Sequence, residues 1–137
     1  MNTTRAIPFD TAHIVGADEH HRAAAEQFRQ AIGPYVFMSL GASQLAAVPG
    51  RYDRGGLLFT ARILPFTRTG DRYAAARNMA VLVSTSPLDE IEIEVREYAR
   101  GVQHAKIEGV YIDQLSRAVL ALDYDGTEAL NPRYWQQ

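Results

Sequence analysis

The sequence feature that most constrains the fold is an amphipathic pattern in residues 109–122. Apolar side chains there follow the three-then-four spacing that places them on one stripe of a helix, while Gln114 and Arg117 fall outside it. Such a stripe leaves water only by packing on another apolar layer. The pattern therefore predicts a helix docked on a sheet. The residues expected to pack on the sheet are Val110, Ile112, Leu115, Val119 and Leu122.

Three segments have the patterns of β-strands. Residues 79–83 are apolar at every position, which predicts a central strand covered on both faces. Residues 57–64 and 91–96 instead alternate between apolar and polar side chains, which predicts strands with one face in water. We expect Glu92 and Glu94 on that wet face.

An N-terminal helix is expected over residues 19–32. Asp18 is a suitable N-cap, and Gly33 followed by Pro34 is a strong stop signal. Shorter strands are expected at residues 35–40, 44–48 and 102–107. Together the elements predict an α+β fold, in which a single antiparallel sheet of about five strands is flanked by an N-terminal and a C-terminal helix.

The 137 residues are enough for a single domain with a core of its own. Within it, residues 1–17 are expected to form a flexible arm and residues 123–137 a C-terminal tail. The absence of cysteine excludes disulfides and thiolate chemistry. With no signal-peptide pattern and no apolar run near the roughly 18 residues that span a bilayer, we expect a cytoplasmic protein with no membrane contact.

No motif in the chain predicts an enzyme. The spacings of a nucleophile elbow, a P-loop and a dinucleotide fingerprint are all missing. His20 and His21 would diverge on a helix and are expected to be exposed, not to bind metal. Residues 123–128 resemble the start of a calcium loop but lack required acidic ligands. We expect no metal, no cofactor and no catalysis, although paired carboxylates need only spatial proximity and stay open.

Charge is unevenly distributed along the chain. Residues 51–77 hold six arginines against two aspartates, and residues 78–97 hold five acidic residues against one arginine. Arginines interleaved with aromatic residues could bind the phosphates and bases of a nucleic acid. The competing and favoured interpretation is that these arginines pair with the acidic strand, because the net charge of the protein is only −2. Candidate nucleic-acid contacts are Arg62, Arg68, Arg72, Tyr73 and Arg77.

The motif Gly109-Val110-Tyr111-x-Asp113-Gln114-Leu115 is the most distinctive in the chain. With the order of weaker motifs between Phe28 and Leu122, it resembles a family of small uncharacterised proteins encoded by bacteriophages, prophages and other mobile elements. The chain departs from that pattern at Ile91, where such proteins usually carry a tyrosine. The resemblance implies a compact α+β accessory protein and no particular activity.

The leading functional hypothesis is a non-enzymatic phage or mobile-element accessory protein that binds a protein partner, as a counter-defence or regulatory factor or by self-association. The alternative is a nucleic-acid-binding accessory protein that uses the arginine-rich segment. Asp113 and Gln114 also fit a structural role in the first turn of a helix, which is favoured, and Tyr111 is expected to be packed with its hydroxyl bonded. Candidate partner contacts are Glu92, Glu94, Asp113, Gln114, Tyr134 and Trp135.

Overall fold

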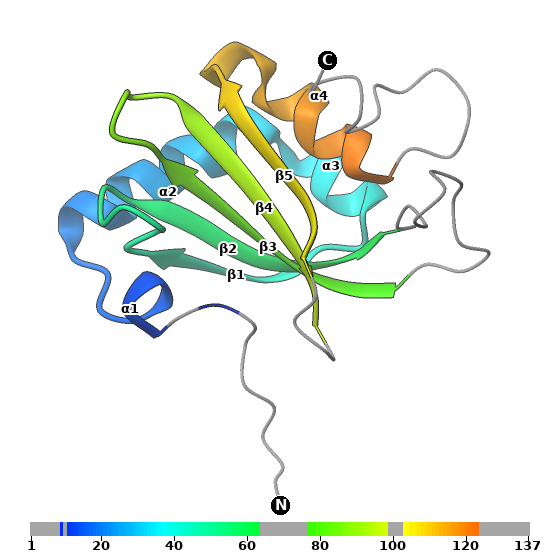
Figure 1. Cartoon of the computed structure of the whole chain (residues 1–137). Helices are drawn as coiled ribbons and strands as arrows, with labels where there is room; N and C mark the ends of the chain where they lie inside the picture. Colours follow the sequence, from blue (N-terminus) through cyan, green and yellow to red (C-terminus); the bar gives the residue numbers. More distant parts are fainter. Residues whose placement is uncertain (1–8, 10, 64–76, 99–102, 124–137) are drawn as a thin grey trace, which may run out of the picture.

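The fold is built on an antiparallel meander (Figure 1). The computed structural model describes residues 9, 11–63, 77–98 and 103–123. Within them the strands are β1 (Ser43–Val48), β2 (Gly56–Ile63), β3 (Arg77–Thr85), β4 (Ile91–Glu97) and β5 (Gln103–Val110). Each strand pairs antiparallel with the next, so β3 is central and β1 and β5 are edges. This confirms the predicted α+β class, its single five-stranded sheet and the central strand.

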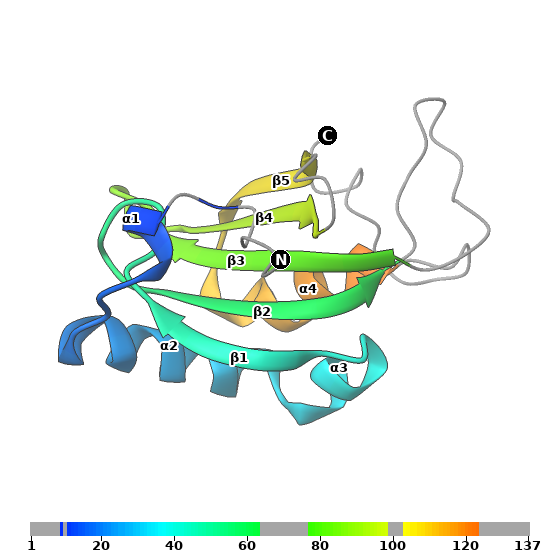
Figure 2. The same cartoon turned by 90° about the horizontal axis from the view of Figure 1, so that it is seen from below.

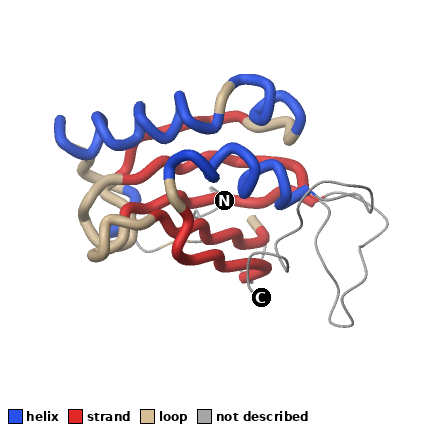
Figure 3. Tube along the Cα trace, turned by 90° about the horizontal axis from the view of Figure 1, so that it is seen from above, coloured by secondary structure: helices blue, strands red, loops and turns tan. Residues whose placement is uncertain are grey.

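Helices cover one face of this sheet (Figure 3). They are α2 (Glu19–Ile32), α3 (Pro34–Ser39) and α4 (Leu115–Leu120), with short 3-10 turns at Ile112–Gln114 and Ala121–Asp123. Helices α2 and α4 contact each other, and the Ser116 hydroxyl donates a hydrogen bond to the Ile32 carbonyl at 3.0 Å. Helices from the two halves of the chain thus pack together in one layer on this face of the sheet.

Local chemistry explains why α2 begins and ends where predicted. An Asp18 carboxylate oxygen accepts from the His21 backbone N–H at 2.9 Å, and His21 Nδ1 accepts from the Asp18 N–H at 3.1 Å. These two bonds satisfy donors that a helix start leaves without partners. At the other end Gly33 has φ 88°, a conformation that glycine adopts without strain. The predicted helix over residues 19–32 is confirmed.

The strand predicted at residues 35–40 is wrong, because this segment forms α3. Pro34 occupies the first turn of the helix, where its missing N–H costs nothing. Val36 and Leu40, four residues apart, are buried in the core. The Phe37 and Phe59 rings pack edge to face, with their centroids 5.3 Å apart. Aromatic content favoured a strand here, whereas burial follows the helical period.

The motif at residues 109–115 is divided between sheet and helix. Val110 ends β5, and Leu115, at 0 % exposure, begins α4 in the main core. Ile112, expected to be buried, is 40 % exposed because it lies in a 3-10 turn that rotates it off the helical stripe. Tyr111, expected to be packed, is exposed, and its hydroxyl lies 3.3 Å from Glu90 Oε2.

A smaller apolar cluster lies on the opposite face of the sheet from the helices. It joins Val48, Leu58 and Leu82 of the first three strands to Phe9 and to Ile14 of the short helix α1 (Thr11–Ile14). Part of the segment expected to be a flexible arm therefore packs on the outer face of the sheet. Both faces of β3 are buried as a result.

Candidate interaction surfaces

The acidic side of β4 is covered, contrary to the expectation that it faces water. Glu94 is only 3 % exposed. Its Oε1 accepts from Arg51 Nη1 at 2.9 Å, and its Oε2 accepts from Arg96 Nε at 2.8 Å. Arg51 comes from the β1–β2 loop, which folds over the sheet at this point. Alternation along β4 separated the two faces correctly but could not reveal that a distant loop covers the polar one.

Glu92 belongs to the same covered region. The Tyr52 hydroxyl donates to Glu92 Oε2 at 2.8 Å, and this bond to a carboxylate raises the pKa of Tyr52 above its usual value. Glu92 Oε1 is buried and has no hydrogen-bond partner within the described part of the chain. Glu92 and Glu94 therefore both bond to side chains of the β1–β2 loop; Glu94 is buried, whereas Glu92 is half-buried.

The β1–β2 loop is held in place by α2. His21, expected to be exposed, is buried, and its Nε2 lies 2.9 Å from Asp53 Oδ1 and 3.2 Å from the Asp53 carbonyl. Because Nδ1 accepts from the Asp18 N–H, Nε2 is the nitrogen that carries the proton toward Asp53. Gly55 packs so closely on α2 that a Cβ there would lie 2.5 Å from the Ala24 Cβ.

Three arginines of the basic segment are neutralised by acidic residues. Besides the contact of Arg51 with Glu94, Arg54 Nη2 lies 2.5 Å from Asp89 Oδ1 and Arg77 Nη1 lies 2.5 Å from Glu97 Oε2. This confirms, for these three, the interpretation that the arginines pair with the acidic strand. Of the candidate nucleic-acid contacts, Arg77 is thus in an ion pair, and Arg62 donates to the Asn78 amide oxygen at 3.2 Å. Arg68, Arg72 and Tyr73 lie outside the described residues.

Two further candidates lie in the 3-10 turn before α4. Gln114 Oε1 accepts from the Tyr111 backbone N–H at 3.1 Å, which caps the turn. Asp113 is exposed in the first turn, where a carboxylate is favoured by the helix dipole. Both positions fit the structural role favoured from the sequence. Tyr134 and Trp135 lie outside the described residues.

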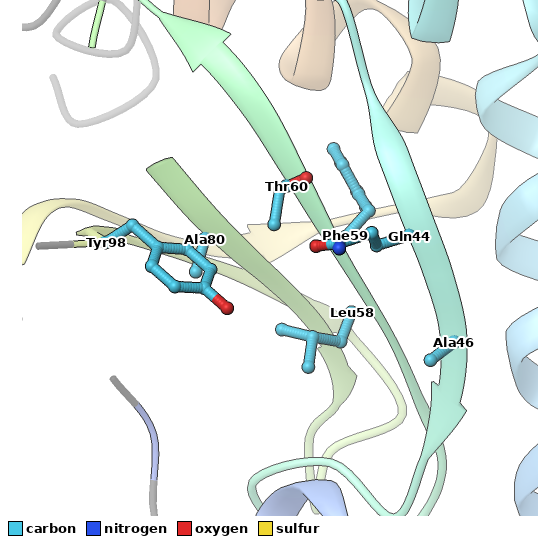
Figure 4. A pocket seen from close by; sticks show the side chains of 7 residues that line it. All are labelled: Gln44, Ala46, Leu58, Phe59, Thr60, Ala80 and Tyr98. Carbon is cyan, nitrogen blue, oxygen red and sulfur yellow. The ribbon is translucent and has the colours of Figure 1, made fainter. Parts of the chain in front are cut away.

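A shallow hollow of about 280 Å³ lies on the outer face of the sheet (Figure 4). Alanines at positions 46 and 80 leave the space, and Tyr98 and Leu58 border it. Its lining is mostly apolar and contains no charged side chain. The lining residues are Gln44, Ala46, Leu58, Phe59, Thr60, Ala80 and Tyr98.

A second hollow, of about 260 Å³, lies between α2 and the edge strand β1, and we call it the α2–β1 groove. Figure 2 shows α2 beside this edge of the sheet. The helix contributes residues spaced three, four and seven apart, which form one face along the groove. The lining residues are Arg22, Ala25, Glu26 and Arg29 of α2, Leu45, Ala46 and Ala47 of β1, and Leu57 of β2.

Sequence reasoning missed the α2–β1 groove, although it predicted both the helix and the strand that form it. The spacing of Arg22, Glu26 and Arg29 was the available signal. It indicates an exposed charged helix face but does not identify which strand lies beside that face. At one end of the groove, α3 joins α2 to β1 and exposes Tyr35 and Met38 at 74 % and 79 %.

No family model, curated protein or solved structure matches the chain. Among the described residues, no group of three or more His, Asp or Glu side chains could hold a metal ion. No helix in that part of the chain is long and apolar enough to cross a membrane.

Proposed function

We propose that this is a non-enzymatic protein-binding module that takes an extended segment of a partner protein as an additional strand along β1. The observation that carries the proposal is the position of the α2–β1 groove beside an edge strand that, among the described residues, pairs on one side only. Recognition of this kind combines backbone hydrogen bonds along a sheet edge with side-chain contacts in an adjoining groove. The resemblance of residues 109–115 to mobile-element proteins supports a role as an accessory factor, in counter-defence or regulation.

The geometry of β1 supports a short bound segment. Gln44 has φ 58°, and the register with β2 shifts between Ser43 and Ala46, so the start of the strand is irregular. From Ala46 to Val48 the pairing with β2 is regular. A partner strand would find regular backbone geometry over this part of the edge, where alternate residues direct their N–H and C=O groups outward.

Exposed apolar side chains at this edge support the same proposal. Leu45, 38 % exposed, lines the groove, and Tyr35 and Met38 project from α3 at its end. Aromatic residues and methionine are enriched where proteins contact one another. The ion pairs of Arg51, Arg54 and Arg77 give less support to the nucleic-acid alternative, because paired guanidinium groups must first release their carboxylates to bind phosphate.

Selection from a displayed random peptide library tests the proposal. We expect enrichment of extended apolar sequences, and nuclear magnetic resonance should show the largest amide shifts in β1 and α2. Leu45→Asp should abolish binding. The matched control is Leu88→Asp, which places the same charge on an exposed leucine of the β3–β4 turn and should bind normally.

Two results would contradict this function. One is a selection that yields no peptide perturbing β1, together with binding to labelled single-stranded DNA that weakens steeply with salt, which would favour the nucleic-acid alternative. The other is a dimer in sedimentation that Leu45→Asp converts to a monomer. A second copy of the chain would then occupy this edge.

A further inference from the structure

We infer that the segment bound in the α2–β1 groove carries an acidic side chain, which binds the guanidinium of Arg22. This inference rests on the proposed function and names the chemistry of its partner. It follows from a difference between the two arginines that line the groove, Arg22 and Arg29.

Arg29 is already neutralised within α2. Its Nε and Nη2 donate to the two carboxylate oxygens of Glu26 at 2.9 and 2.5 Å, a bidentate arrangement. The Gln30 amide adds a third bond to Glu26 Oε2 at 3.0 Å. Hydrogen bonds from Arg29 and then Gln30 lower the pKa of Glu26 to about 2, so the carboxylate is charged at neutral pH. This end of the groove therefore presents a closed ion pair.

Arg22 has no carboxylate partner within the described part of the chain. Glu26, four residues further along the helix, directs both oxygens toward Arg29 and Gln30 instead. Arg22 Nη1 donates to the backbone carbonyl of Ala17, at 3.1 Å. Arg22 is exposed and lines the groove, and a carboxylate is the group that matches the planar geometry of the remaining guanidinium N–H donors.

The fold also gives the position of the acidic residue along the segment. Asp53 and Gly55, which follow β1, contact the first turns of α2, whereas α3 joins the end of α2 to the start of β1. Helix and strand therefore run in opposite directions, with Arg22 near the end of β1. A segment antiparallel to β1, the commoner pairing, passes Arg22 first and Leu45 later.

Spacing follows from elementary geometry. Arg22 and Arg29 lie seven positions apart in α2, which is about 10 Å along the helix at ~1.5 Å per residue. An extended chain crosses that distance in about three residues. We therefore expect the acidic residue beside Arg22 to precede the residue that passes Arg29 by about three positions.

The experiment compares the best selected peptide with a version in which its acidic residue is replaced by the corresponding amide. Fluorescence anisotropy should show about tenfold weaker binding of the amide peptide to the unmodified protein. Arg22→Ala should bind both peptides with equal affinity, and Arg22→Glu should select basic peptides in place of acidic ones. Arg117→Ala removes an exposed arginine of α4 and should behave like the unmodified protein.

The possible results distinguish a failure of the role of Arg22 from a failure of strand binding along β1. Peptides that perturb β1 but show no acidic preference, with Arg22→Ala binding unchanged, would overturn the role of Arg22 and leave the groove intact. A selection that gives no β1-binding peptide would overturn both.

Discussion

Replacing Leu115 tests whether α4 packs on the sheet through the main apolar core. Leu115 is 0 % exposed and lies in the main apolar cluster. Leu115→Ala removes three carbon atoms, which costs about 2.5 kcal/mol in transfer free energy at ~0.8 kcal/mol per methylene. An unrelaxed cavity of about 50 Å³ adds about 1 kcal/mol at ~24 cal/mol per Å³. We expect the free energy of unfolding to fall by about 3–4 kcal/mol.

Ile112 provides a control within the same motif. It is also a large aliphatic residue, but it is 40 % exposed in the preceding turn. Ile112→Ala should cost less than about 1 kcal/mol, because much of the side chain is already in water. Any general effect of shortening a side chain in this motif would appear in both variants.

Urea unfolding followed by circular dichroism gives both free energies. Equal m-values would show that the variants unfold the same structure, so that midpoints can be compared directly. Small domains unfold with about 5–15 kcal/mol, so Leu115→Ala should remain folded in buffer. Leu115→Asp should not fold, because it buries a carboxylate without a partner. A loss below about 1 kcal/mol for Leu115→Ala, or equal losses for the two alanine variants, would refute the docking of α4.

Three further predictions concern charged groups. Glu94→Gln should cost about 2 kcal/mol in urea unfolding because it leaves two arginines facing a neutral amide, whereas Glu108→Gln, at an exposed pair, should change stability by less than about 0.5 kcal/mol. The pKa of Glu26 is lowered from 4.5 to about 2, so its contribution is complete above pH 4.5 and is lost as the pH falls through 2; melting temperatures should show this, and Glu26→Gln should reduce the dependence. The raised pKa of Tyr52 means that its contribution is complete below pH 10 and is lost as the pH rises through the folded value; ultraviolet titration should show that Tyr52 ionises at a lower pH in Glu92→Gln than in the unmodified protein.

Periodicity revealed most of the sheet. The unbroken apolar run at 79–83 identified the central strand, and alternation over 91–96 identified β4. Periodicity failed for α3, because six residues are too few to distinguish a strand from a helix. Contacts with the core, such as that of Phe37 with Phe59, stabilise the helix instead. Short segments take their conformation from tertiary packing more than from propensity.

The candidate sites were harder to predict because they depend on elements distant in sequence. Pairing of the arginines with the acidic strand was foreseen from opposite charges in neighbouring segments, but the burial of Glu94 depends on a loop that His21 fixes to α2. The α2–β1 groove likewise requires knowing which strand lies beside the helix. Local sequence patterns show neither that the loop packs on α2 nor that β1 lies beside this helix.

The position of α4 has a consequence for how the chain is made. A ribosome releases the sheet strands before residues 115–120, so β3, β4 and β5 emerge while part of their helix-side face has no cover. The nascent protein must therefore hold an apolar surface in water, or bound to a chaperone, until the last described helix arrives. Any delay between the emergence of β5 and that of α4 would prolong this interval and favour aggregation.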